Sequence, residues 1–287
     1  MRVVQVLRTG LSRLGRTLRI QARGTAPSAL PLAGYSEHRH EIPFIDPLSD
    51  ADLTELNQLF RWHAFTVDSH GRRFGGVAWA GKRDRPQKIP DPRIVLMHER
   101  FQLRDKHVLE FGCFEGIHTI GLARLAGRVT AVDGRIENVA KTIVRSALYG
   151  CSPRVFKYDV ETVPANAGLL RADLLHHVGV LYHLTDPVRH LRELGRYIRV
   201  GVMLDTHVAT DEEATQSYEV EGRAFAYKAY QELGHRDVFS GLYAESKWLP
   251  LGAIVELLKE TGFGSVEVVE TRQERNGPRV LLFASRT

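Results

Sequence analysis

The stretch that decides the fold is residues 108–116, which read Val-Leu-Glu-Phe-Gly-Cys-Phe-Glu-Gly. Residues 108–111 form a short apolar run that predicts a buried strand, and residues 117–125 predict a helix. Gly112 and Gly116 lie in the turn between them, where glycine lets the backbone turn tightly and approach a ligand closely. A strand, a glycine-containing turn and a helix in this order indicate the first unit of a doubly wound sheet, in which ligands bind beside this turn.

The rest of the sequence continues the alternation on both sides of this unit. A helix capped by Asp91 and Pro92 is predicted before it, and two strands joined around residues 276–278 are predicted at the end. The fold class is therefore α/β, with a doubly wound (Rossmann-like), mostly parallel seven-stranded sheet and an antiparallel strand in the C-terminal hairpin. The other predicted strands are 129–133, 155–158, 174–178, 201–204, 266–270 and 280–284, and the other predicted helices are 137–149, 188–197 and 248–261.

The charge is distributed unevenly along the chain. The net charge is +5, but residues 1–24 hold six arginines and no acidic residue, so the remaining chain carries −1. Apolar residues and arginines of this leader fall on opposite sides of a helix, which predicts a basic amphipathic segment. We expect it to contact a membrane surface, to act as a targeting leader, or to dock on its own domain or on a second copy. A nucleic-acid partner is disfavoured because the body of the chain is near neutral.

The sequence predicts four further regions, and its composition excludes several classes of protein. Residues 25–50 are proline-rich and predict a linker, residues 51–90 a cover region, and residues 91–287 the main domain with a lid insertion at 206–247. With 43% hydrophobic and 25% charged residues the chain is neither disordered nor fibrous. Two cysteines exclude a cysteine-based zinc site, and we predict no metal site. No apolar run approaches the length of a membrane span, so we expect a cytoplasmic or membrane-peripheral protein.

An acidic residue at the end of the second predicted strand helps to define a candidate cofactor site. Asp133 ends the second strand 21 residues after Gly112, where a carboxylate can accept hydrogen bonds from ribose hydroxyls. A dinucleotide-binding turn would have glycine where this chain has Phe114. The turn therefore favours a nucleoside with an amino-acid tail over a pyrophosphate.

The stretch from Glu110 to Gly116 resembles the first motif of the class I S-adenosylmethionine-dependent methyltransferases, an acidic residue followed by x-Gly-x-Gly-x-Gly. It departs from that motif at Phe114, in place of the middle glycine, and at Glu115, in place of a small residue. The resemblance implies S-adenosyl-L-methionine as cofactor, with Glu110 and Gly112 near its methionine part, Asp133 on its ribose and Asp159 near its adenine. The full predicted cofactor set is Glu110, Gly112, Cys113, Phe114, Glu115, Gly116, Asp133, Gly134, Asp159, Val160 and Val178.

A second stretch, residues 178–191, contains Gly-Val-Leu-Tyr-His followed by a proline and His-Leu. It resembles a subgroup that includes the tRNA wobble-uridine carboxymethyltransferases and methyltransferases that act on small molecules or glycans. We predict methyl transfer from plain S-adenosylmethionine to a small-molecule, sugar or lipid-linked acceptor, most simply at oxygen. The alternatives are a tRNA wobble-uridine modifying enzyme and a non-catalytic cofactor-binding scaffold, the latter suggested by Phe114 and Glu115.

Candidate catalytic residues follow the fourth and fifth predicted strands. His183 is the candidate general base because imidazole titrates near neutrality, and Tyr182 is a candidate for orienting the acceptor. Asp205 and His207 form a second candidate pair. The competing interpretation is that Tyr182 and His183 only pack locally. Aromatic residues in 206–247 predict a substrate lid, and the basic residues of 72–88 are a second candidate contact for an acidic ligand.

Overall fold

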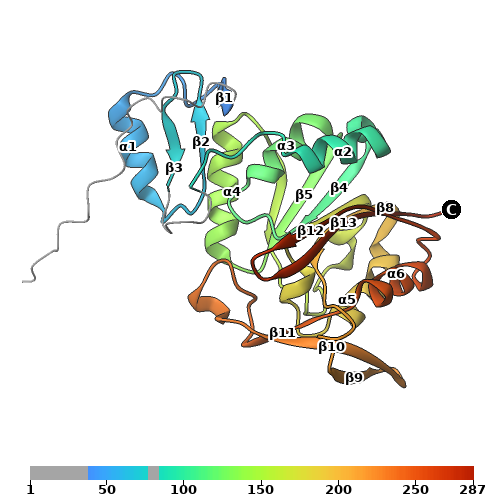
Figure 1. Ribbon diagram of the computed structural model, residues 1–287. Helices are drawn as coiled ribbons and strands as arrows, with labels where there is room; N and C mark the ends of the chain where they lie inside the picture. Colours follow the sequence, from blue (N-terminus) through green and yellow to red (C-terminus); the bar gives the residue numbers. More distant parts are fainter. Residues whose placement is uncertain (1–37, 77–83) are drawn as a thin grey trace, which may run out of the picture.

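In the computed structural model of the chain, residues 38–76 and 84–287 are described (Figure 1). The main sheet has seven strands in the order β12-β13-β8-β7-β4-β5-β6, and β13 alone runs in the direction opposite to the other six. This arrangement confirms the predicted fold class. The strands are β4 (His107–Phe111), β5 (Arg128–Asp133), β6 (Arg154–Lys157), β7 (Ala172–Val178), β8 (Ile198–His207), β12 (Ser265–Glu274) and β13 (Gly277–Ser285).

Helices cover both faces of this sheet. On one face, α2 (Pro92–Phe101) and α3 (Ile117–Leu125) bury Ile94, Met97 and Leu122 against alternate residues of the central strands. On the other face, α5 (Pro187–Tyr197) and α6 (Leu251–Glu260) form a second apolar core with the intervening residues of the same strands. Because successive strand residues point to opposite faces, strands buried on both sides read as continuous apolar runs.

Local sequence signals set several element boundaries. The Asp91 side chain accepts a hydrogen bond from the Arg93 amide and Pro92 occupies the first turn of α2, as predicted. The helix predicted from residue 248 begins instead at Leu251, because Pro250 supplies its N-cap and Trp248 belongs to a strand, β11 (Glu245–Trp248). The helix α4 (Ile136–Leu148) follows β5 and contacts both β5 and β6.

The N-terminal part of the described chain forms a small layer of its own, which packs on α4. It consists of β1 (Arg39–His40), α1 (Asp50–Leu59), β2 (Phe65–Asp68) and β3 (Arg73–Gly75). Residues 25–50 were predicted to be a linker, but in the described part of that range Ile42 and Ile45 are fully buried. A linker would not bury apolar side chains, so residues 38–50 are part of this layer. Arg72, one of the candidate ligand-binding basic residues, is itself buried and paired with Asp68.

The insertion between β8 and α6 is a three-stranded antiparallel sheet with a loop. Its strands are β9 (Gln216–Val220), β10 (Arg223–Gln231) and β11, in the order β11-β10-β9. The region predicted as a lid from residue 206 begins later than that, because Thr206 and His207 still pair with β13. Tyr218 contacts both Phe225 and Tyr227, and Phe225 belongs to the apolar core formed with α5 and α6, so these aromatic residues pack the insertion onto the domain.

The leader at residues 1–24 and the residues 77–83 lie outside the described part of the chain. Among the described residues, the helices include none with the length and apolar character needed to cross a bilayer.

Candidate active site

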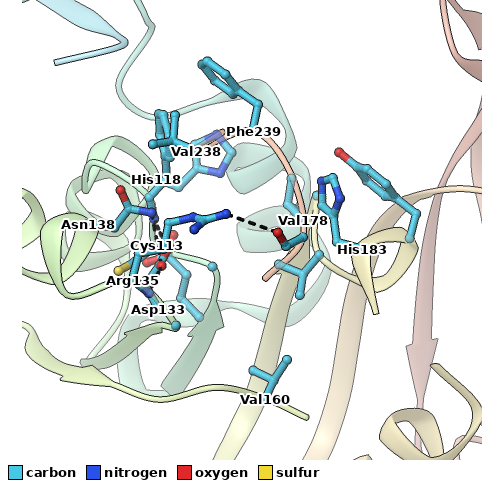
Figure 2. A pocket seen from close by; sticks show the side chains of 18 of the residues that line it. Cys113, His118, Asp133, Arg135, Asn138, Val160, Val178, His183, Val238 and Phe239 are labelled. Atoms are coloured by element: carbon cyan, nitrogen blue, oxygen red, sulfur yellow. Dashed lines mark hydrogen bonds between the residues drawn. The ribbon is translucent and has the colours of Figure 1, made fainter. Parts of the chain in front are cut away.

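A cavity of about 630 Å³ opens at the carboxyl ends of the parallel strands (Figure 2). It lies where the strand order reverses between β4 and β7, the position at which doubly wound sheets bind ligands. Its wall is formed by the β4–α3 turn, the ends of β5 and β7, the start of α2, residues 238–242 of the insertion and the C-terminal hairpin.

The turn after β4 has a left-handed backbone conformation at all three positions where the motif has glycine. Gly112, Phe114 and Gly116 have φ angles of 71°, 50° and 80°, so Phe114 adopts the left-handed conformation that the missing motif glycine would adopt easily. That conformation costs about 1 kcal/mol in a residue with a side chain. A Cβ on Gly112 would lie 2.5 Å from Val180 Cγ2, and one on Gly116 would lie 3.0 Å from Thr142 Cα. Gly112 therefore keeps the cavity open, and Gly116 lets the turn pack on α4.

Asp133 holds this turn in place. Its carboxylate accepts hydrogen bonds from the backbone amides of Phe114 (3.0 Å) and Arg135 (2.8 Å) and from the Asn138 side chain (3.1 Å). Burial raises the pKa of Asp133, and these donors oppose the rise. The residue lines the cavity while bracing the β4–α3 turn, so it combines a structural task with a position suited to ligand contact.

Glu115, the second departure from the motif, belongs to a buried ion cluster. Its carboxylate accepts hydrogen bonds from the amides of His63 (2.7 Å) and Ala64 (3.0 Å) and pairs with Lys141 at 3.0 Å and Arg145 at 3.7 Å. Burial would raise the pKa of Glu115, but the His63 hydrogen bond and the two cations lower it. Glu115 thus joins the N-terminal layer to α4 directly behind the cavity.

Three aromatic rings gather at one side of the cavity. Phe114 lies 5.4 Å from Phe239 of the insertion and 6.3 Å from His63 of the N-terminal layer, measured between ring centroids. The Arg135 guanidinium donates hydrogen bonds to the carbonyls of residues 234, 237, 240 and 241, which fixes the insertion loop over the cavity. Phe114 therefore lacks the conformational freedom of glycine, but its ring makes contacts that close this side of the cavity.

The remaining predicted cofactor residues, apart from Gly116, also line the cavity. Gly134, Val160 and Val178 form wall surface, and Asp159 accepts a hydrogen bond from the Tyr243 hydroxyl at 2.7 Å. Cys113 lies in the wall with its thiol buried, and burial raises its pKa well above the ordinary value. A thiol held in its neutral form is a poor nucleophile, so Cys113 has a packing role.

His183 lies across the cavity from Cys113 and Asp133 (Figure 2). It shares the 3₁₀ turn Leu181–His183 with Tyr182, which also lines the cavity. His183 Nδ1 lies 2.8 Å from Glu232 Oε1, a buried carboxylate at the end of the insertion's β10. Glu232 also accepts hydrogen bonds from Ser240 Oγ, the Gly241 amide and Ser246 Oγ. Burial alone would raise the pKa of Glu232, but the interactions with His183 and Ser240 lower it to about 2. The imidazole is therefore held by a fixed, ionised carboxylate.

Asp205 and His207 are not brought to the cavity wall. Asp205 is fully buried and pairs with Arg93, Arg272 and Arg279, which line the cavity in its place. His207 is buried with its ring stacked on Trp248 at 4.9 Å and its Nδ1 3.2 Å from the Pro278 carbonyl. Both residues lie on β8, which pairs with β13 as far as His207. Their side chains are buried within the packed sheet, so an acceptor in the cavity cannot contact them directly.

Comparison with known proteins agrees with this geometry. Residues 109–204 match the family model described as "Methyltransferase domain". The chain therefore contains a methyltransferase domain of the class I, S-adenosylmethionine-dependent type. The matched range contains the glycine turn, Asp133, Asp159 and His183, and it ends within β8.

Solved structures show the same fold for the methyltransferase. The N-terminal domain of EvdMO1 with S-adenosylhomocysteine bound is 22% identical, with a TM-score of 0.70 over 84% of this chain and 98% of that chain. The same domain in the presence of S-adenosylhomocysteine and D-fucose is 24% identical, with a TM-score of 0.63 over 76% and 88% of the two chains. The YcgJ protein from Bacillus subtilis is 12% identical, with a TM-score of 0.50 over 67% and 97%. Comparison with curated protein sequences gave no match.

The methyltransferase cavity fits S-adenosylmethionine, the cofactor of this class. The cofactor carries a sulfonium and an ammonium group, and the wall offers the carboxyl groups of Glu110, Asp133 and Asp159. The space that Gly112 leaves beside Val180 allows a ligand to approach the backbone of the turn. Asp133 and Asp159 end or follow adjacent strands, the positions from which a ribose and an adenine can be contacted.

Sequence reasoning missed several residues that line the methyltransferase cavity or act on it. Glu232 lies 49 positions after His183, and no local pattern links the two. Arg93, His118, Arg135 and the loop at 238–242 reach the wall only through tertiary packing. Asn138 was also missed, although a local signal could have identified it, because it lies at the start of the helix that follows Asp133.

Proposed function

We propose that this methyltransferase acts on a hydroxyl oxygen of a sugar or similar polyhydroxylated small molecule, with His183 as the general base. The observation that carries the proposal is the His183–Glu232 pair at the cavity wall, with 2.8 Å between Nδ1 and Oε1. A hydroxyl is a weak nucleophile until its proton is accepted during the reaction, and a positioned imidazole serves that purpose near neutral pH.

The hydrogen bond to Glu232 selects the tautomer of His183. With its proton on Nδ1 and directed at the carboxylate, the ring carries its lone pair on Nε2, the nitrogen that would accept the acceptor's proton. Glu232 then stabilises the imidazolium that results, because it is ionised and buried. Bound S-adenosylmethionine supplies an electrophilic methyl group, and the chain's own part is to orient the acceptor and take its proton.

The acceptor end of the cavity favours a molecule with several hydroxyl groups. Glu270, Arg272, Glu274 and Arg279 line it, so carboxylate acceptors and guanidinium donors alternate there. A hydroxyl both donates and accepts hydrogen bonds, and a wall with both types of partner suits it. The EvdMO1 domain crystallised in the presence of D-fucose supports the choice of a sugar for the first assays.

The test is methyl transfer from labelled S-adenosylmethionine to a panel of deoxysugars, sugar nucleotides and glycosides. For a substrate that is turned over, His183→Asn should keep the hydrogen bond to Glu232 and the affinity for S-adenosylhomocysteine, while kcat falls about 10²–10⁴-fold. His70→Asn, an exposed turn residue outside the cavity, is the matched control and should leave kcat unchanged. Unchanged turnover in the His183 variant would remove it as the base, and no binding of S-adenosylhomocysteine to the native chain would reject the enzyme assignment.

Glu232 is a positioning residue under this proposal, and a second variant tests it. Glu232→Gln keeps the size of the side chain but removes the charge that stabilises the imidazolium. We expect kcat to fall about 10–100-fold with little change in the KM for the acceptor. A rise in KM at constant kcat would show that Glu232 only shapes the pocket.

A further inference from the structure

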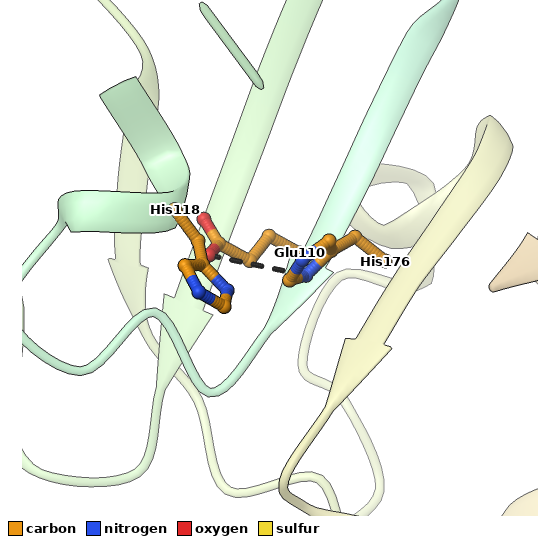
Figure 3. A group of neighbouring side chains, drawn as sticks. All are labelled: Glu110, His118 and His176. Atoms are coloured by element: carbon orange, nitrogen blue, oxygen red, sulfur yellow. Dashed lines mark ion pairs between the residues drawn. The ribbon is translucent and has the colours of Figure 1, made fainter. Parts of the chain in front are cut away.

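Three side chains of metal-binding type meet beside the methionine end of the cavity (Figure 3). Glu110 comes from β4, His118 from the first turn of α3, and His176 from β7. One ligand atom of each lies within 4.8 Å of the others. Ligands of one tetrahedral zinc-like ion stand about 2.0–2.2 Å from it, and hence roughly 3.4 Å from one another. Movements of the side chains that shorten the widest of these separations by about 1.4 Å at most would bring all three onto one ion.

His176 is the member of the group that most needs explanation. It is 1% exposed, and neither of its ring nitrogens has a hydrogen-bond partner within the described residues 38–76 and 84–287. Glu110 Oε1 lies 4.0 Å from its Nδ1, too far for a hydrogen bond. A buried polar group without a hydrogen-bond partner destabilises the folded state, and a bound ion would supply the missing partner.

The other two side chains are already oriented by neighbours. Thr119 Oγ1 donates a 2.6 Å hydrogen bond to Glu110 Oε2, which leaves Oε1 as the oxygen that faces His176. The Asp91 carboxylate lies 3.3 Å from His118 Nε2, and Arg93 lies 3.4 Å from the same nitrogen. A carboxylate beside a histidine is the outer contact that typically orients a metal-ligating imidazole.

The charge of the surroundings favours a cation despite the nearby arginines. A continuous chain of ion pairs links the group to the acceptor end of the cavity. Among the described residues it contains three guanidinium groups and four carboxyl groups, namely Arg93, Arg272, Arg279, Asp91, Asp205, Glu270 and Glu274, and it reaches the group through the Asp91–His118 contact. These groups carry one surplus negative charge, which favours a cation beside them.

We propose that Glu110, His118 and His176 form a binding site for one divalent first-row metal ion, of which Zn²⁺ is the type. Two imidazoles and one carboxylate suit Zn²⁺, Fe²⁺ and Co²⁺ better than Mg²⁺ or Ca²⁺, which prefer oxygen ligands. Glu110 and His118 line the cavity, so the ion has a path to the site. The site replaces our sequence-based prediction of no metal, which considered only cysteine ligands and could not see residues on three separate elements converge.

The experiment uses the full chain without an affinity tag, stripped with a chelator and titrated with Co²⁺ in the absence of cofactor. One equivalent should produce visible ligand-field absorption, and Zn²⁺ should displace it. His118→Ala, at a partly exposed position that tolerates truncation, and His176→Asn should each weaken Co²⁺ binding at least about tenfold. His177→Asn is the matched control: it is the next residue of β7, equally buried, faces the opposite side of the sheet and is paired with His190 at 2.8 Å.

Two results would overturn the site. If the native chain shows no Co²⁺ absorption at micromolar metal concentration, the site is rejected. It is also rejected if the absorption survives in both the His118→Ala and the His176→Asn variant. Thermal unfolding of each variant without metal shows whether it has folded, and the His118 variant preserves the test if the buried His176 variant has not. The readout is metal absorption alone, so it is independent of whether methyl transfer to a sugar is observed.

Discussion

Replacing Glu115 by glutamine tests whether this departure from the methyltransferase motif anchors the N-terminal layer. The side chain is fully buried and accepts two backbone hydrogen bonds while facing Lys141 and Arg145, both fully buried. Removing one partner of a buried ion pair typically costs about 3–5 kcal/mol, because the remaining charge is left uncompensated. Lys141 keeps Glu137 and the Arg61 carbonyl, and Arg145 keeps its stacking on Trp62. We therefore expect the low end of this range, about 3 kcal/mol, for Glu115→Gln.

Urea unfolding followed by circular dichroism measures the loss as a change in midpoint at constant slope. The matched control is Glu137→Gln, which removes a carboxylate 2.7 Å from the same Lys141 but at a half-exposed position on α4. An exposed pair of this kind contributes at most about 0.5–1 kcal/mol. If Glu115→Gln and Glu137→Gln lower the free energy of unfolding by the same amount, Glu115 is not the anchor and the reasoning is refuted.

Three further predictions concern the cofactor turn and the acid stability of the fold. Gly116→Ala should destabilise the protein by more than Gly222→Ala, because both glycines have φ near 80° but only at Gly116 would a Cβ meet backbone, 3.0 Å from Thr142 Cα; equal melting temperatures of the two variants would contradict this. Asp133→Ala should abolish calorimetric binding of S-adenosylhomocysteine, and an affinity within tenfold of the native value would remove Asp133 as a cofactor residue. Glu232, with its pKa lowered to about 2 in the folded state, should contribute up to roughly 3 kcal/mol of stability that is complete above about pH 4.5 and lost as the pH falls toward 2. Acid unfolding of Glu232→Gln should lack that component, and identical acid transitions would count against the ionised pair with His183.

The sequence by itself determined the sheet and the cofactor half of the site. Strands buried on both faces are apolar without interruption, and turn glycines and helix caps act within a few residues, so β4, α3, β5 and the cap of α2 could be placed from local pattern. For the same reason the residues at successive strand ends, Asp133 and Asp159, could be assigned to one cavity before any coordinates existed, since parallel strands bring their carboxyl ends together.

Tertiary structure alone decided the rest, because those contacts join residues far apart in the chain. Glu232 reaches His183 only because the insertion folds back over the 3₁₀ turn, and Asp205 is withdrawn from the cavity because three arginines from α2 and the C-terminal hairpin converge on it. From the sequence, Glu115 was only a departure from the motif. The structure shows that its carboxylate accepts hydrogen bonds from two backbone amides of the N-terminal layer. Local pattern encodes the period of an element and its ends, whereas the partner of a buried charge depends on which elements pack together.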